Sequence, residues 1–128
     1  MFLFHLIKDF FISKDVVYIQ DQTLFLDILE DLKSKKILAI DTEFTWRKTY
    51  FPELNLIQIS TENKIYIIDC HYINISELES VFLNKNITKI FHSLRGDLSV
   101  LYNSFGLKVT NIFDTQLAHN VLYKIQGN

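Results

Sequence analysis

The sequence predicts a single α/β domain in which a mixed β-sheet is flanked by helices. The chain has 128 residues and a mass of 15.1 kDa, the size of one ordinary domain. Apolar residues make up 48% of it, so it can bury a core, and a disordered chain is excluded. Strand and helix patterns are interleaved, with an antiparallel hairpin first and helix-linked strands afterwards, which is typical of a sheet with antiparallel and parallel pairs.

The first third of the chain shows a strand, a helix and a second strand. The β-branched and aromatic run 16–20 predicts the strand, and Asp21 or Thr23 is expected to cap a helix that ends near Ser34. The continuous apolar run 37–40 predicts a central strand buried on both faces, ending at a carboxylate. The apolar face of the helix repeats at helical spacing and consists of Leu24, Phe25, Ile28, Leu29 and Leu32.

The middle of the chain contains a hairpin and a short helix. Alternating segments 54–60 and 64–69 are separated by three polar residues, which predicts an antiparallel hairpin. Ser76 and Glu79 have the spacing of a capping box. The helix that they open is expected to bury Leu78, Val81 and Phe82.

The last third repeats the strand and helix pattern. Segment 88–92 predicts an inner strand, followed by a helix from about Gly96 that Gly106 stops. Segment 111–113 is strand-like, and Asp114 is expected to cap a final helix. The apolar residues of that helix are Leu117, Val121 and Leu122.

Charge, cysteine content and the N-terminus limit the class of protein. The net charge is −2 with a pI near 6.0, so any nucleic-acid contact must come from a local arrangement. Cys70 is the single cysteine, which excludes an internal disulfide and favours a cytoplasmic protein. Residues 1–15 predict a short N-terminal extension that packs on the domain. Because charges interrupt its apolar run, the extension resembles neither a signal peptide nor a membrane-spanning helix. A weak contact with a membrane or a partner is the alternative.

Three carboxylates stand where ligands of such sheets gather. Asp41 and Glu43 end the most buried strand, with both side chains on one face, and Asp97 lies in the first turn of the helix after strand 88–92. Like charges at the edge of a core need a cation, and oxygen ligands select Mg²⁺ or Mn²⁺. The alternatives are a strand-end turn for the pair and a helix-dipole charge for Asp97.

The sequence resembles a known family in three segments. DTEFTWRKTYFPELNLIQI (41–59) and FHSLRGDL (91–98) are similar to the first two exonuclease motifs of ribonuclease D, and FDTQLA (113–118) is similar to the segment that follows them. The match extends from about Val16 to the C-terminus in the expected order, so residues 16–128 are assigned to a partial exonuclease domain.

The resemblance implies a ribonuclease H-like fold and a 3'-5' exonuclease that acts on RNA 3' ends with four acidic residues and two metal ions, Mg²⁺ or Mn²⁺. Asp41, Glu43 and Asp97 match the first three acids. Phe44 is placed to stack on the terminal base, although a core phenylalanine is the alternative. Further substrate contacts are expected from Thr42, His92 and Arg95, with His92 as a strand-end hydrogen-bonding residue in the alternative.

The chain departs from the family pattern in two places. Trp46 stands where the family commonly has a basic residue, although Arg47 and Lys48 follow it. No Tyr-x-x-x-Asp or His-x-x-x-Asp, the third motif, follows Asp97, and Thr110 precedes Asp114 at that spacing. We therefore expect that the C-terminal part of the domain is missing, that this chain is weak or inactive alone, and that it exposes an apolar patch or self-associates. The alternatives are a non-catalytic nucleic-acid-binding remnant and one half of a split exonuclease completed by a second polypeptide.

Overall fold

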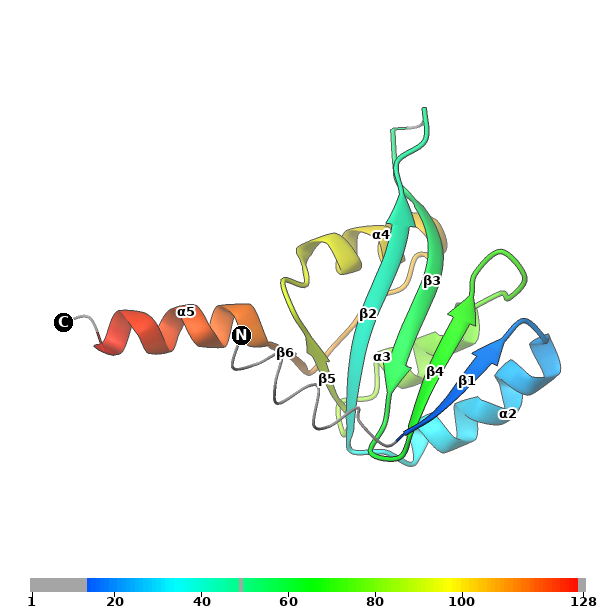
Figure 1. Cartoon of the computed structure of the whole chain (residues 1–128), viewed down its shortest axis with the longest axis horizontal. Helices are drawn as coiled ribbons and strands as arrows, with labels where there is room; N and C mark the ends of the chain where they lie inside the picture. Colours follow the sequence, from blue (N-terminus) through cyan, green and yellow to red (C-terminus); the bar gives the residue numbers. More distant parts are fainter. Residues whose placement is uncertain (1–13, 49, 127–128) are drawn as a thin grey trace.

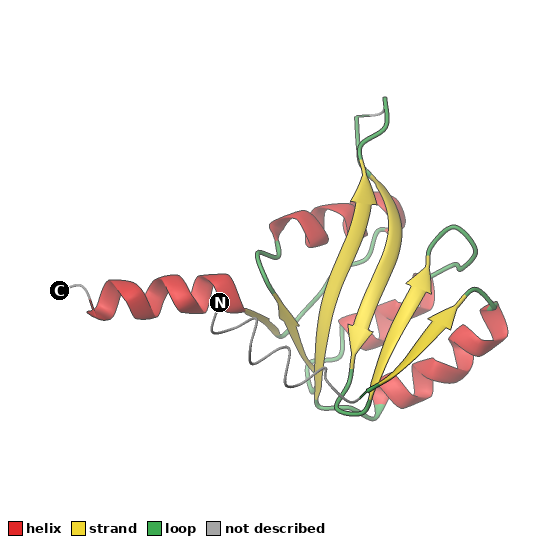
Figure 2. Ribbon diagram, in the orientation of Figure 1, coloured by secondary structure: helices red, strands yellow, loops and turns green. Residues whose placement is uncertain are grey.

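The computed structural model of the chain describes residues 14–48 and 50–126. It contains a six-stranded sheet in the order β1-β4-β3-β2-β5-β6 (Figures 1 and 2). The β2/β3 and β3/β4 pairs are antiparallel, whereas β1/β4, β2/β5 and β5/β6 are parallel, as the mixed-sheet prediction requires. The elements are β1 (Asp15–Ile19), α2 (Gln22–Lys33), β2 (Ile37–Thr45), β3 (Glu53–Ser60), β4 (Lys64–Asp69), the 3₁₀ turn η1 (Ser76–Leu78), α3 (Glu79–Phe82), β5 (Thr88–Phe91), α4 (Arg95–Phe105), β6 (Ile112–Asp114) and α5 (Thr115–Gln126).

The described helices cover one face of the sheet and leave the other, called here the open face, without a described helix; the residues of β2 that point to it are half-buried or exposed. Helices α2, α3 and α4 lie on one side of the strands (Figure 2), and the side chains that point toward them form the core. On β2, Leu38 and Ile40 are buried, while Ile37, the first residue of the strand, is 50% exposed. Strand β2 is central, as predicted, but the expectation that it is buried on both faces is wrong, because its alternate residues point to the open face.

The helix predictions are confirmed in their positions and corrected in some details. Asp21 caps α2 by accepting a hydrogen bond from the Leu24 N–H at 2.8 Å, but Leu24 itself is exposed, at the edge of the predicted apolar face. The capping box at Ser76 is wrong. The Ser76 hydroxyl and N–H both donate to Asn74 Oδ1, at 2.7 and 3.0 Å, and this local turn competes with the cap.

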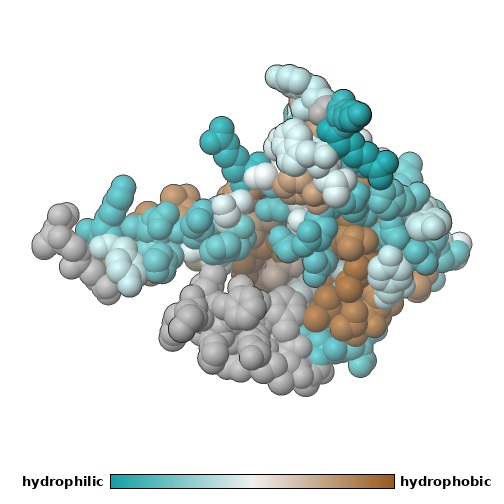
Figure 3. Space-filling view, turned by 45° about the horizontal axis from the view of Figure 1, so that its top comes forward, coloured by the Kyte–Doolittle hydropathy of each residue, from teal (hydrophilic) through white to brown (hydrophobic). Residues whose placement is uncertain are grey.

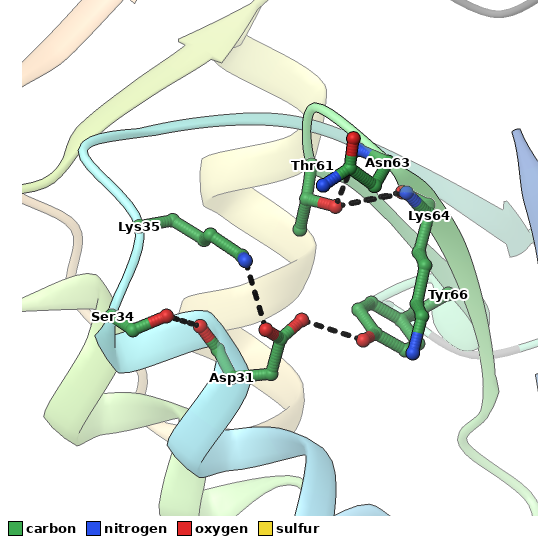
Figure 4. A network of polar contacts seen from close by, with 7 residues as sticks. All are labelled: Asp31, Ser34, Lys35, Thr61, Asn63, Lys64 and Tyr66. Carbon is green, nitrogen blue, oxygen red and sulfur yellow. Dashed lines mark hydrogen bonds and ion pairs between the residues drawn. The ribbon is translucent and has the colours of Figure 1, made fainter.

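A polar network ties α2 to the sheet through a buried tyrosine (Figure 4). The Tyr66 hydroxyl of β4 donates to Asp31 Oδ2 at 2.6 Å, and Lys35 Nζ lies 2.9 Å from Asp31 Oδ1. Burial and the hydrogen bond to the neighbouring carboxylate raise the pKa of Tyr66. Thr61 closes the β3–β4 turn in the same view by accepting hydrogen bonds from the N–H groups of Asn63 and Lys64. The network fixes how α2 lies across the covered face.

Apolar side chains also reach the surface of the described residues. Figure 3 shows hydrophobic residues among hydrophilic ones on the body and along α5. Exposed apolar residues are therefore present, whereas a continuous apolar patch and self-association stay predictions. The largest exposed examples on β1, β2 and α5 are Val16, Tyr18, Ile37, Leu117, Val121, Leu122 and Tyr123.

The N-terminal extension lies mostly outside the described residues. Only residues 14 and 15 of the predicted segment 1–15 are described, and Asp15 already belongs to β1, so a packing role for residues 1–13 stays a prediction. Within the described part of the chain, no helix is long and apolar enough to cross a membrane.

Candidate functional site

Two of the predicted acidic residues lie on the open face of the sheet. Asp41 and Glu43 are both exposed and sit in the middle of β2. The expectation that the strand ends at Asp41 is wrong, because β3 continues to pair with β2 as far as Thr45. The register shifts between Glu43 and Phe44, and such a β-bulge re-aims side chains and is over-represented beside active sites.

Asp97 reaches β2 from the other direction, at a gap in the sheet. β5 pairs with β2 only as far as Ala39, so the edge of β2 beyond that residue has no neighbouring strand on this side. Asp97, in the first turn of α4, fills the gap: its Oδ1 accepts hydrogen bonds from the Thr42 N–H at 3.1 Å and from the Thr42 hydroxyl at 2.5 Å. The fold thus brings a carboxylate from α4 to the segment that holds Asp41.

The negative charge of Asp97 is destabilised by its surroundings. Asp97 is 7% exposed. Its pKa is raised, mainly by burial and also by the charge of Asp41, while the hydrogen bonds from Thr42 act in the opposite direction. Two carboxylates that repel each other at a half-open site are the arrangement that a divalent cation stabilises.

The donor set fits one hard cation held by few protein ligands. Carboxylate oxygens are what Mg²⁺ and Mn²⁺ prefer, and Mg²⁺ is usually bound through one or two carboxylates together with water and substrate phosphates. Asp41 and Asp97 are two carboxylates whose charges influence each other, and binding of an ion by this pair stays a prediction. Among residues 14–48 and 50–126, however, no three His, Cys, Asp or Glu side chains are grouped to hold one ion. Participation of Glu43 as a third ligand therefore stays a prediction.

Phe44 packs on the first turn of α4. A Cβ atom placed on Gly96 would lie 3.3 Å from Phe44 Cζ, which is tighter than ordinary contact, so the absence of a side chain at Gly96 lets the ring approach the helix. Phe44 is half-buried and packs against the core. The core interpretation describes its contacts, and stacking on a base stays a prediction for the part of the ring that is exposed.

His92 lies between β5 and α4, and Arg95 is the first residue of α4. The Thr115 hydroxyl donates to the Phe91 carbonyl oxygen at 3.1 Å and lies 2.9 Å from His92 Nδ1. Because the hydroxyl has a single proton, which it gives to Phe91, the bond to His92 is assigned with Nδ1 as the donor, and in that tautomer of the neutral ring Nε2 is an acceptor. Arg95 begins α4 and is exposed. Both residues are accessible, but their contact with substrate stays a prediction.

Asp114 holds the turn that precedes α4. Its carboxylate accepts from the N–H groups of Gln116 at 2.8 Å and Leu117 at 3.3 Å, which confirms the predicted cap of α5. It also accepts from Ser93 and Leu94, both at 3.1 Å. Burial opposes these bonds, yet together they lower the pKa of Asp114.

The contact of Asp114 with the turn before α4 was not predicted from the sequence. The positive φ of 61° at Ser93 is stabilised by a residue 21 positions downstream. A capping pattern reports only the local half of the bonding, so no sequence signal pointed to the contact with the turn before α4.

Comparison with known proteins identifies the group to which this site belongs. The family model described as "3'-5' exonuclease" matches residues 16–127. The chain belongs to this 3'-5' exonuclease family. The match spans both candidate motifs and all six strands except Asp15, the first residue of β1. Together with the relatives named ribonuclease D, it confirms the resemblance to that family.

Similar proteins carry two related names. The chain is 33% identical over 104 residues to ribonuclease D of Acidiphilium cryptum, covering 80% of this chain and 26% of that one. It is 33% identical over 108 residues to the exosome complex exonuclease RRP6 of Saccharomyces cerevisiae, covering 83% of this chain and 15% of the relative. The chain thus spans about a quarter or less of the length of these two relatives.

Solved structures give the same result for the fold. Escherichia coli RNase D superimposes with a TM-score of 0.77 and 30% identity, over 82% of this chain and 28% of that one. The catalytic core of RRP6 from Trypanosoma brucei superimposes with a TM-score of 0.79 and 28% identity, over 88% and 32% of the two chains. The predicted α/β exonuclease fold is confirmed.

Proposed function

We propose that this chain provides the first three acidic residues of a 3'-5' exonuclease that hydrolyses RNA from its 3' end with Mg²⁺ or Mn²⁺. The observation that carries the proposal is the anchoring of Asp97 beside Asp41 by two hydrogen bonds from Thr42. Family membership and the relatives named ribonuclease D support the reaction and the RNA substrate.

Each residue has a proposed task that follows from its position. Two divalent cations, when bound, activate the attacking water and stabilise the leaving 3' oxygen. Asp41 and Asp97 hold negative charge at the edge of β2, with Glu43 on the same open face as Asp41. Thr42 keeps the Asp97 carboxylate in place, and the half-exposed ring of Phe44 contacts the terminal base.

The segment before α4 contributes the remaining contacts. Arg95 is exposed at the start of the helix and is proposed to contact a phosphate, and His92 is proposed to accept a hydrogen bond through Nε2. The lone Cys70 is consistent with action in the cytoplasm, which we propose as the compartment.

We expect slow hydrolysis by the 128-residue chain alone. The sequence after Asp97 contains no Tyr-x-x-x-Asp or His-x-x-x-Asp, so it offers no match to the fourth acid or to the group that orients the attacking water. Groups of a catalytic unit are strongly non-additive, and loss of one removes most of the rate. The alternative functions are a nucleic-acid-binding remnant and one half of a split enzyme, in which a second polypeptide supplies the missing motif. In each case the nucleic acid is single-stranded RNA, with DNA as the alternative.

The test is metal-dependent release of 3' nucleotides from single-stranded RNA by the purified chain. Asp41→Ala should abolish the Mg²⁺- or Mn²⁺-dependent release, while Asp27→Ala, which removes an exposed aspartate on α2, should leave it unchanged. Release that survives Asp41→Ala contradicts the proposed site. No release from wild type, together with retained RNA binding, favours the binding remnant or the split enzyme, and recovery on adding a polypeptide that carries the third motif favours the split enzyme.

A further inference from the structure

The hairpin that continues β2 and β3 ends in a group of exposed aromatic residues. It projects beyond the rest of the sheet (Figure 1). Trp46 is 66% exposed, Tyr50 is 87% exposed and Phe51 is 51% exposed. The rings of Tyr50 and Phe51 meet edge to face with centroids 4.9 Å apart. Large aromatic side chains gathered at a protruding tip are unusual unless they contact a ligand.

Basic residues are interleaved with these rings. Arg47 and Lys48 follow Trp46 directly, and both are exposed. Arg47 Nε lies 2.8 Å from Glu53 Oε2 across the base of the hairpin, which fixes the direction of the arginine while most of its side chain stays exposed. The chain as a whole carries a net charge of −2, so Lys48, together with Arg47 paired to Glu53, forms a local basic group on a slightly acidic molecule.

The tip begins directly after the strand that carries Asp41 and Glu43. Asp41, Glu43 and Thr45 belong to β2, and the next residue is Trp46. At about 3.3 Å per residue, Trp46 is roughly 17 Å along the strand from Asp41. A single strand whose 3' end lies at Asp41 therefore needs only a few nucleotides to reach the tip.

We propose that the tip of the β2–β3 hairpin, formed by Trp46, Arg47, Lys48, Tyr50 and Phe51, binds single-stranded RNA upstream of the 3' end. The aromatic rings stack on bases without reading sequence, and the basic side chains contact phosphates. The direction of the strand, with its 3' end at the carboxylates, rests on the proposed function. Arg47 and Lys48 lie between Trp46 and the Tyr50–Phe51 pair, and lysine is depleted in protein–protein interfaces, which favours a nucleic acid over a protein partner.

Trp46 makes the proposal directly measurable, because it is the single tryptophan of the chain. Stacking of a base on its indole ring quenches the intrinsic fluorescence. The probe is a dodecauridylate in EDTA, where no metal-dependent hydrolysis takes place, and a diuridylate serves as the short control. We expect stronger quenching and tighter binding with the dodecamer than with the dinucleotide, because the longer strand can contact several rings and basic side chains of the tip at once.

Variants separate stacking, charge and fold. Trp46→Ala should weaken dodecamer binding, measured by anisotropy of a labelled probe, by roughly 5- to 100-fold, and Trp46→Phe should restore most of it. Lys48→Ala should lower the slope of log affinity against log salt by about 0.7. Tyr123→Ala, which removes an exposed aromatic residue on the distant helix α5, is the matched control and should change nothing.

The outcomes distinguish this proposal from the proposed function. Equal affinity of wild type and Trp46→Ala for the dodecamer overturns the hairpin site, as does an absence of binding by wild type. Neither result affects metal-dependent hydrolysis that is sensitive to Asp41→Ala. Conversely, a chain without hydrolysis whose Trp46 fluorescence is quenched by the dodecamer, and whose affinity falls with Trp46→Ala, supports the hairpin site while the catalytic proposal fails.

Discussion

Replacement of Asp114 tests whether one carboxylate stabilises both the turn before α4 and the start of α5. Asp114→Ala removes the acceptor of four backbone N–H groups, with N···O distances from 2.8 to 3.3 Å. Loss of a helix cap costs about 1 kcal/mol. Hydrogen bonds to a charged group are each worth about 1.5–3 kcal/mol, of which water recovers a part at the exposed Ser93. We therefore expect a total loss of about 2–4 kcal/mol of unfolding free energy.

Asp114→Asn is the matched variant, because the amide keeps Oδ1 but replaces Oδ2. Oδ1 accepts from Ser93, Gln116 and Leu117, and Oδ2 accepts from Leu94, so the amide should preserve three bonds and lose about half as much stability. Urea unfolding followed by circular dichroism at pH 7 gives both values.

The pH dependence provides a second check on Asp114. The folded-state pKa of Asp114 is lowered, so its contribution is full above the unfolded value of about 3.9 and is lost as the pH falls through the folded value. The difference in unfolding free energy between wild type and Asp114→Ala should therefore become smaller in strong acid. Equal stability of Asp114→Ala and wild type at pH 7, or equal losses for the alanine and asparagine variants, would refute the bridging role.

Three other buried groups give predictions. Asp97→Asn keeps an acceptor oxygen for Thr42 but removes a carboxylate whose pKa is raised in the folded state, so that its ionisation above about pH 4 destabilises the fold. The unfolding free energy at pH 7 should therefore be maintained or increased, while the rise in Tm on adding Mg²⁺ disappears. A rise in Tm equal to that of wild type contradicts the metal site. Tyr66→Phe should lower the unfolding free energy at pH 7, measured in urea, by about 1 kcal/mol. Burial raises the pKa of Asp31, but Lys35 and Tyr66 lower it overall, so the cost of the substitution should fall once acid protonates Asp31. A cost that does not change with pH would argue against the hydrogen bond. Burial lowers the pKa of Lys89, so the unfolded chain binds that proton more tightly than the folded chain. The unfolding free energy of wild type should therefore rise with pH until the pH reaches the unfolded-state pKa near 10.4. Calorimetry of Lys89→Met should not show this rise.

The sequence predicts those parts of the fold that depend on local patterns. Asp21 and Asp114 accept from N–H groups within three residues, and Gly106 ends α4 with a φ of +69°, so their neighbours in sequence are sufficient to assign them. The hairpin of β3 and β4 follows from alternation and a short polar turn. Each of these features is determined within a few residues.

The errors arise where distant segments decide the outcome. β2 extends through Asp41 and Glu43 because β3 pairs with it, although acidic residues are poor strand formers. Ile37 is exposed because the described helices cover only one face, which a run of apolar residues cannot reveal. At the site, the motif marked Asp97, but its bond to Thr42 depends on β5 ending early, a property of the assembled sheet.

The exposure of α5 has a consequence for local stability. The helix has twelve residues, and an isolated helix of that length is marginal in water. Leu117, Val121 and Leu122 remain exposed, so among residues 115–124, whose side chains the structure describes, little apolar burial supports the helix beyond its capped first turn. Its amide hydrogens should exchange with solvent by local opening at a free energy well below that of the sheet. Slowed exchange in α5 alone would then report, residue by residue, any molecule that covers this apolar side.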